Sequence, residues 1–109
     1  MASFVAREVL LAPDLVARAA TIATTDPAQR WMLSQPRTVR TSYAYQVLDR
    51  GGHEREQHAW MLRQPATVRE SYLTNVAIPQ GAGRQVIWML RQPDSVRESY
   101  VREVLSSGG

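Results

Sequence analysis

A block of thirteen residues that occurs three times constrains this chain more than any other feature. It reads WMLSQPRTVRTSY from Trp31, WMLRQPATVRESY from Trp60 and WMLRQPDSVRESY from Trp88. Nine of the thirteen positions are identical in all three copies, and the copies start 29 and then 28 residues apart. A period of this length indicates that the chain is built from successive copies of one supersecondary unit.

Each copy predicts two helices with a proline between them. The first helix is short and should end at the glutamine, so we expect it over Pro27–Gln35, His53–Gln64 and Arg84–Gln92 (or from Gly83). The second should follow Pro36, Pro65 or Pro93, because proline in the first helical turn loses no hydrogen bond. The alternative is one long helix that the interior proline kinks. Two pairs also have capping-box spacing, Thr67 with Glu70 and Ser95 with Glu98.

The residues before Trp31 predict one more helix and a partial repeat. The alanine-rich stretch Asp14–Thr24 follows Pro13 and reads as a helix, after which Asp26 or Thr25 should cap a helix starting at Pro27. The sequence REVL occurs at Arg7–Leu10 and again at Arg102–Leu105, so the chain is expected to begin within a repeat.

The predicted fold class is therefore all-α, a small array of helix–Pro–helix repeats of 28–29 residues in a single domain over residues 1–109. The expected parts are a half-repeat at 1–12, a helix at 13–25 and repeats at about 27–52, 53–80 and 81–109.

Helical periodicity assigns the side chains of each unit to a buried or an exposed side. In the last second helix, Val96, Tyr100 and Val104 fall on one side and form the predicted buried stripe. The tryptophans and the Met-Leu pair after each are expected in the core. Glu98 is expected to face water and to pair with Arg102, four residues later.

The repeated arginines project toward the apolar side of the same wheel and have two interpretations. A structural guanidinium would stack on a tryptophan and bond the carbonyls at the end of the short helix. A functional set would line one groove and bind an anion or an acidic partner. The repeated glutamines would cap the following helix or clasp the backbone of the next unit. The partner-binding candidates are Arg40, Arg69, Arg97, Gln35, Gln64 and Gln92.

Composition excludes several kinds of chemistry. All 13 basic residues are arginine, and the chain has no lysine and no cysteine. A lysine Schiff base, a P-loop lysine, a disulfide framework and a thiolate zinc site are therefore excluded. The two histidines, His53 and His58, are five residues apart and do not share a helix face as a zinc pair requires. We expect no metal site, no cofactor and no enzymatic activity.

Two functions fit this pattern. We favour a structural or interaction protein, a helical-repeat scaffold that binds a protein partner and self-assembles through an unsatisfied end. The alternative is a nucleic-acid-binding regulator. Residues Ser34–Tyr43 loosely resemble the turn and recognition helix of helix-turn-helix regulators. The first unit is also the most basic, since no acid stands between Pro27 and Leu48, so the expected nucleic-acid contacts are Arg30, Arg37 and Arg40.

No membrane partner is expected. The longest uninterrupted apolar run is Val86–Leu90, far below the roughly 18 residues that a membrane span needs. Arg7 and Glu8 interrupt the N-terminal apolar residues, so they do not form a secretory signal, and a cytoplasmic location is expected.

Overall fold

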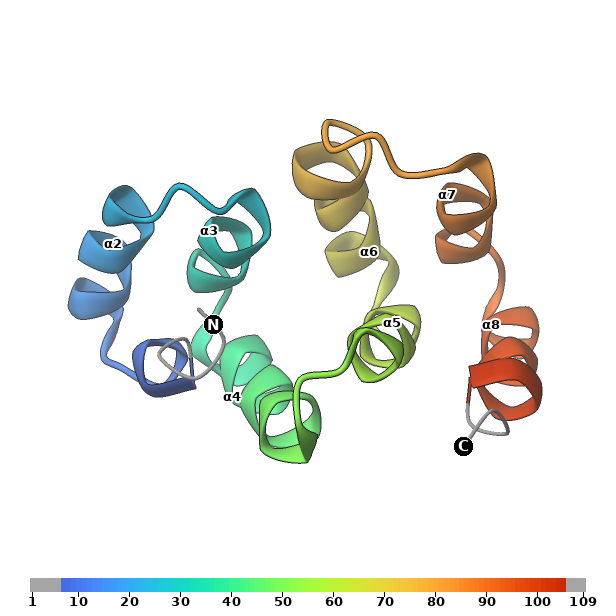
Figure 1. Cartoon of the computed structure of the whole chain (residues 1–109), viewed down its shortest axis with the longest axis horizontal. Coiled ribbons are helices and arrows are strands. Elements are labelled where there is room, and N and C mark those ends of the chain that lie inside the picture. The colour runs from blue at the N-terminus through green and yellow to red at the C-terminus, as the bar shows by residue number, and fades with distance from the viewer. Residues whose placement is uncertain (1–6, 106–109) are drawn as a thin grey trace. The chain divides into compact units, whose positions relative to one another are not determined.

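Helices make up all of the regular secondary structure in the computed structural model, which describes residues 7–105 (Figure 1). The all-α prediction is therefore confirmed, and no strand occurs within that range. The helices are residues 7–10, α2 (Asp14–Ala23), α3 (Pro27–Leu33), α4 (Arg37–Gln46), α5 (Glu54–Leu62), α6 (Ala66–Tyr72), α7 (Arg84–Leu90) and α8 (Asp94–Tyr100). A 3-10 turn, η1 (Leu48–Arg50), follows α4, and the π-helical segments η2 (Leu73–Ala77) and η3 (Val101–Leu105) extend α6 and α8. None of the helices in residues 7–105 is long and apolar enough to cross a membrane.

Each tryptophan block folds as two helices joined by a turn, and not as one kinked helix. We call α3–α4 the Trp31 motif, α5–α6–η2 the Trp60 motif and α7–α8–η3 the Trp88 motif. The short helices end at Leu33, Leu62 and Leu90, two residues before the predicted glutamines. The glutamines lie in the turns instead, where their side chains bond the preceding helix.

The prolines stand one position earlier in their helices than predicted. Pro36, Pro65 and Pro93 are N-cap residues, with φ near −60° and ψ of 155°, 161° and 164°. The fixed φ of proline suits this extended N-cap backbone as well as it suits the first helical turn.

The predicted capping boxes are wrong for the same reason. With proline at the N-cap, Thr67 and Ser95 lie inside the first turn, and the N-caps of α6 and α8 make no side-chain hydrogen bond. The cap predicted for α3 is confirmed: Asp26 Oδ1 accepts from the backbone N–H of Ala28 at 3.0 Å, and Pro27 is the first helical residue.

A fourth helix–Pro–helix motif precedes the three tryptophan motifs. Residues 7–10 are helical, a turn ends at Pro13, and α2 follows, which confirms the predicted helix after this proline. We call residues 7–23 the N-terminal motif. Leu10 stands three residues before Pro13, as Leu90 does before Pro93, so by position Arg7–Leu10 belongs to a first helix. Arg102–Leu105, which has the same four letters, ends a second helix. The half-repeat at 1–12 stays a prediction, because residues 1–6 lie outside the described residues.

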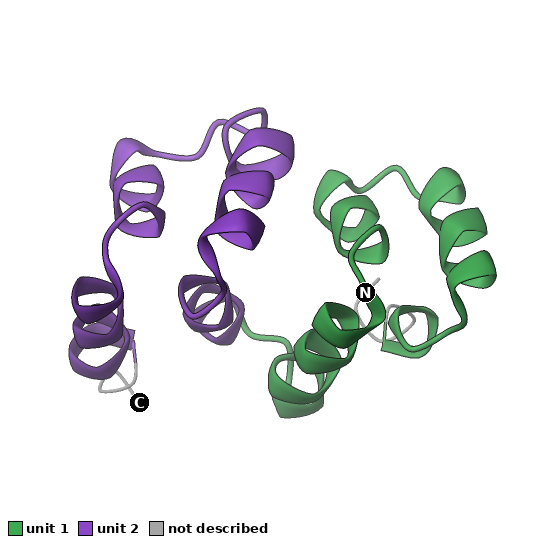
Figure 2. Ribbon diagram, turned by 180° about the vertical axis from the view of Figure 1, so that it is seen from behind, with its two compact units in different colours: residues 1–53 green, residues 54–109 purple. Residues whose placement is uncertain are grey.

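The chain divides into two compact units, residues 1–53 and 54–109 (Figure 2). The first unit holds the N-terminal and Trp31 motifs, and the second holds the Trp60 and Trp88 motifs. Two motifs therefore make up each unit. The single domain over 1–109 and the continuous array of repeats stay predictions.

The leucine three residues before each proline is a constant part of the core. Leu10, Leu33, Leu62 and Leu90 are at most 4% exposed. The tryptophan and methionine before Leu33 and Leu62 are also buried, as predicted.

The Trp88 motif departs from the predicted core. Trp88 is 57% exposed, whereas Trp60 is 4% exposed. The predicted stripe is also wrong, because Val96 and Val104 are 36% and 51% exposed. Arg97 and Val101 are the buried residues of α8 and η3. A wheel gives the angles between side chains, but the neighbouring helices decide which side becomes the interior.

Candidate functional site

The arginines at the repeated position lie on the packed side, as the wheel predicts. Arg40, Arg69 and Arg97 are 0%, 8% and 5% exposed. A guanidinium is always charged and has five N–H donors, so its burial requires acceptors placed around it. The local packing of the motifs provides most of these acceptors.

In the unit of residues 54–109, two of these arginines join the two motifs. Arg69 donates from Nε to the Gln64 carbonyl at 2.9 Å and from Nη1 to the Leu90 carbonyl. Arg97 donates from Nε to the Gln92 carbonyl at 2.8 Å and from Nη1 to the Leu62 carbonyl. Each guanidinium thus ties its own turn to the last carbonyl of the other motif's short helix. Such carbonyls have no partner within their helix.

At the surface of the unit, two ion pairs also join the Trp60 motif to the Trp88 motif, one in each direction. Arg63 Nε lies 3.0 Å from Glu98 Oε2, and Arg91 Nε lies 3.0 Å from Glu70 Oε2. The predicted pairing of Glu98 with Arg102 is therefore wrong. All four side chains are about half exposed, so each pair contributes at most about 1 kcal/mol. The arginine contacts are reciprocal: each of these hydrogen bonds and ion pairs from the Trp60 motif to the Trp88 motif has its equivalent in the opposite direction.

The two buried guanidiniums share one nearby carboxylate. Asp94 forms an ion pair with Arg97, three residues later, whereas Ala66 stands at the equivalent place before Arg69. Burial lowers the pKa of Arg69, and the charge of Arg97 lowers it further, while Asp94 and Glu70 act in the opposite direction. Backbone carbonyls are therefore the main hydrogen-bond acceptors of the two buried guanidiniums between the Trp60 and Trp88 motifs.

The first unit contains a related contact in one direction only, in which Ala12 and not Leu10 provides the backbone carbonyl and the buried Nε of Arg40 has no hydrogen-bond partner. Arg40 donates from Nη2 to Asp14 Oδ1 at 2.8 Å and from Nη1 to the Ala12 carbonyl at 3.3 Å. In the N-terminal motif the arginine position is occupied by Ala17, which is 2% exposed, so this motif returns no such bond.

A surface contact joins the same two motifs. Arg7 Nε lies 2.6 Å from Asp49 Oδ1, and its guanidinium lies 5.3 Å from the centre of the Tyr45 ring. The hydrogen bond with Asp49 raises the pKa of Arg7.

The side chains of the repeated glutamines bond the C-terminal end of the helix that precedes them. Their Nε2 atoms donate to the carbonyl of the tryptophan four residues earlier, at 3.1 Å for Gln35, 2.9 Å for Gln64 and 3.0 Å for Gln92. They satisfy end carbonyls of the short helices, and their N–H groups do not cap the helix that follows. The partner-binding role of these glutamines and of the buried arginines stays a prediction.

The structure does not bring the predicted nucleic-acid contacts together at the surface. Arg30 is exposed and donates to the Thr24 carbonyl at 3.2 Å, and Arg37 is exposed. Arg40 is completely buried and bonded to Asp14, so its guanidinium cannot reach a phosphate in this conformation.

The histidines do not form part of a metal-ligand group in the described part of the chain, where no three His, Asp or Glu side chains gather. His58, on α5, packs edge to face against Tyr100, with ring centres 6.0 Å apart. Burial lowers the pKa of His58, and the nearby carboxylate of Glu54 offsets part of that effect. The neutral imidazole is therefore the form that this packing favours.

This packing predicts that acid weakens the fold. A histidine with a lowered pKa binds fewer protons when folded, so its contribution is complete above about pH 6.5 and is lost as pH falls toward the folded pKa. Urea unfolding at about pH 7.5 and pH 5.5 should show lower stability at the acid value. His58→Gln should reduce the difference, whereas His53→Gln should preserve it. Equal pH dependence in both variants would contradict this role of His58.

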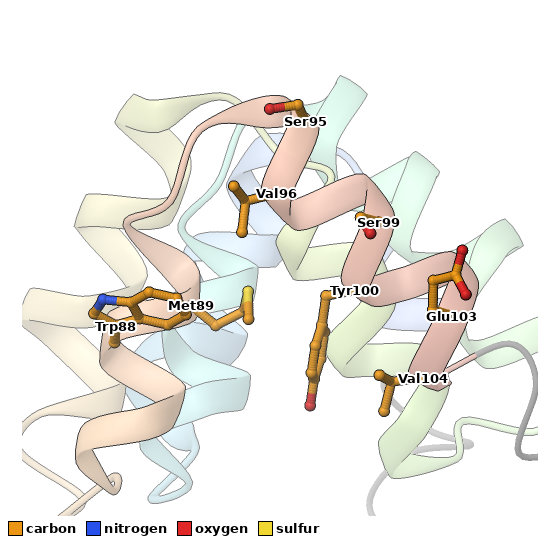
Figure 3. A pocket seen from close by; sticks show the side chains of 8 residues that line it. All are labelled: Trp88, Met89, Ser95, Val96, Ser99, Tyr100, Glu103 and Val104. Carbon is orange, nitrogen blue, oxygen red and sulfur yellow. The ribbon is translucent and has the colours of Figure 1, made fainter.

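The exposed part of the Trp88 motif forms a shallow apolar hollow of about 440 Å³, which we call the Trp88 groove (Figure 3). Trp88 and Met89 project from α7, and Val96, Tyr100 and Val104 face them from α8 and η3 (Figure 3). The remaining lining residues are Ser95, Ser99 and Glu103.

Sequence reasoning missed the Trp88 groove because it assigned these residues to the core. No signal within the block could have found it, because the Trp60 and Trp88 blocks are nearly identical in sequence. The equivalents of Trp88 and Val104 in the preceding motif, Trp60 and Val76, are 4% and 3% exposed.

Comparison of the chain with protein families, curated proteins and solved structures found no match.

Proposed function

We propose that this chain is a non-enzymatic interaction protein whose Trp88 groove binds an amphipathic helix of a protein partner. The observation that carries the proposal is the exposure of Trp88 and Val104, at 57% and 51%, whereas their equivalents in the Trp60 motif are buried. Exposed apolar surface of this kind is typical of interaction sites.

The lining of the groove supports a helical partner. Two helical walls, α7 and α8–η3, place Trp88 and Met89 opposite Val96 and Tyr100 (Figure 3). Tryptophan, tyrosine and methionine are enriched in protein interfaces, and tryptophan and tyrosine in their energetic centres. A helix that presents apolar side chains at three- and four-residue spacing would fill such a hollow. A basic residue beside those side chains would face Glu103.

Nucleic-acid binding by the Trp31 motif is the alternative function. The burial of Arg40 leaves Arg30 and Arg37 as the exposed members of the predicted set. Retardation of duplex DNA that falls steeply with added salt would favour this alternative.

Selection of helical peptides tests the proposed function. A displayed library of amphipathic helical peptides is selected on the full chain, and the selected peptides are measured against Trp88→Glu. We expect at least a tenfold loss of affinity, because the charge replaces the central apolar contact. Ile78→Glu is the matched control, since Ile78 is an apolar residue with 47% exposure that does not line the groove. Selected peptides that bind wild type and Trp88→Glu equally, or no selected peptides, would contradict the proposal.

A further inference from the structure

We infer that the helix bound by the Trp88 groove is α2 of a second copy of this chain, so that copies associate head to tail. This inference rests on the proposed function of the groove and names its partner. It follows from a second exposed apolar surface, on α2.

The apolar side of α2 faces solvent. Leu15, Val16 and Ile22 are 79%, 53% and 85% exposed. With Ala19 and Ala23, which are also exposed, they form what we call the α2 stripe. The opposite side of α2 packs inward through Ala17, which is 2% exposed. A surface helix normally turns its largest apolar side chains inward. In α2 the large side chains point outward and a small one points inward, which indicates that another surface covers the stripe.

The α2 stripe and the Trp88 groove match in length. Leu15 and Ile22 are seven residues apart, which is about 11 Å along a helix axis. Val96 and Val104 are eight residues apart, about 12 Å, on the α8–η3 wall of the groove. Two large aliphatic side chains two turns apart can therefore pack along the groove beside Trp88.

Charge at the edges of the two surfaces is also complementary. Arg18 is exposed on α2 and lies between Leu15 and Ile22 on nearly the same side of the helix. Glu103 lines the groove and is also exposed, and its Oε2 lies 3.9 Å from Arg102 Nε in a surface ion pair that an arginine of another copy can join. An Arg18–Glu103 pair between copies would set the direction of the helix in the groove.

A second copy is the occupant that the matching lengths and the opposite charges of Arg18 and Glu103 favour. The stripe and the groove are different surfaces, so each copy can use one toward each of two neighbours. Such a heterologous contact produces a ring if the rotation closes and an open chain if it does not.

Sedimentation of two blocked variants and their mixture tests the inference. Ile22→Glu blocks the stripe and Trp88→Glu blocks the groove, and circular dichroism checks that both remain helical. At about 100 µM, where a contact below about 1,200 Å² can be populated, we expect wild type to form dimers and larger species. Each variant alone should be monomeric. An equimolar mixture should form a dimer and nothing larger, because it contains one intact stripe and one intact groove. Ile78→Glu should assemble as wild type does.

Each other outcome overturns the inference. Monomeric wild type would exclude a second copy as the occupant, whereas peptide binding that depends on Trp88 would then still support the proposed function. Assembly of Ile22→Glu would exclude the stripe, and assembly of Trp88→Glu would exclude the groove as the contact between copies. Monomeric variants whose mixture also stays monomeric would exclude the pairing of stripe with groove.

Discussion

Replacing Arg69 by lysine is expected to lower the free energy of unfolding by about 2–4 kcal/mol, as measured by urea denaturation followed by circular dichroism. Arg69 donates from two different nitrogens to the carbonyls of Gln64 and Leu90. A hydrogen bond to a charged group contributes about 1.5–3 kcal/mol, and an unsatisfied buried acceptor adds a penalty. A lysine ammonium is a single point donor and cannot reproduce the planar fork that reaches both carbonyls.

The control for this prediction is the same substitution at Arg63. That side chain lies six residues earlier in the same motif, is half exposed and pairs with Glu98. Arg63→Lys should change stability by less than about 1 kcal/mol. Because the contacts are reciprocal, Arg97→Lys should be about as damaging as Arg69→Lys. Equal stability of Arg69→Lys and Arg63→Lys would show that the buried fork does not hold the two motifs together.

Leu10→Ala is expected to cost about 2–5 kcal/mol, the range for removing a leucine side chain from a packed interior. Leu10 is 1% exposed and stands in the first helix of the N-terminal motif, in the place of Leu33, Leu62 and Leu90. Its side chain should therefore contribute as much to the first unit as those leucines do to their motifs. Thermal and urea unfolding of the variant measure the loss.

Leu15→Ala provides the comparison for Leu10→Ala within the same motif. Leu15 is 79% exposed, so its truncation should change stability by no more than about 0.5 kcal/mol. The same variant should weaken association between copies, because Leu15 belongs to the α2 stripe. If Leu10→Ala were as mild as Leu15→Ala, the N-terminal motif would not pack as described.

The features that sequence reasoning predicted correctly are local ones. Helical periodicity and the regularly placed prolines were sufficient for the all-α class, the turns and the helix that follows Pro13. The cap by Asp26 also depends only on neighbouring backbone N–H groups. The predicted helix ends were less accurate, because the φ of proline fits both the N-cap and the first turn, and a one-residue difference removed both capping boxes.

The surface of the Trp88 motif could not be predicted from its own residues. The blocks at Trp60 and Trp88 differ at two of thirteen positions, yet Trp60 is 4% exposed and Trp88 is 57% exposed. Nearly identical sequences fold alike locally, and only their surroundings decide which one is covered. The reciprocal arginine contacts were beyond prediction for a related reason, since each acceptor belongs to the other motif.

The N-terminal motif was not recognised from the sequence, because most of its residues differ from those of the tryptophan motifs. It shares with the Trp88 motif only a spaced pattern: Leu10, Pro13, Asp14 and Val16 match Leu90, Pro93, Asp94 and Val96. The contiguous match of Arg7–Leu10 with Arg102–Leu105 was misleading, because Arg102–Leu105 ends a second helix, whereas Arg7–Leu10 belongs to a first helix. Structurally decisive positions were thus conserved between the motifs at separated places, while the tryptophan and the arginine were replaced.

The reciprocal contacts of the second unit have a consequence for how such a chain could arise. The Trp60 motif donates arginine hydrogen bonds to the Trp88 motif and accepts equivalent bonds from it. The two surface ion pairs are related in the same way. One motif therefore carries both halves of the junction and is complementary to itself. Two separate peptides of that sequence could pair in the same way, and the unit is what gene duplication and fusion of such a peptide homodimer would produce.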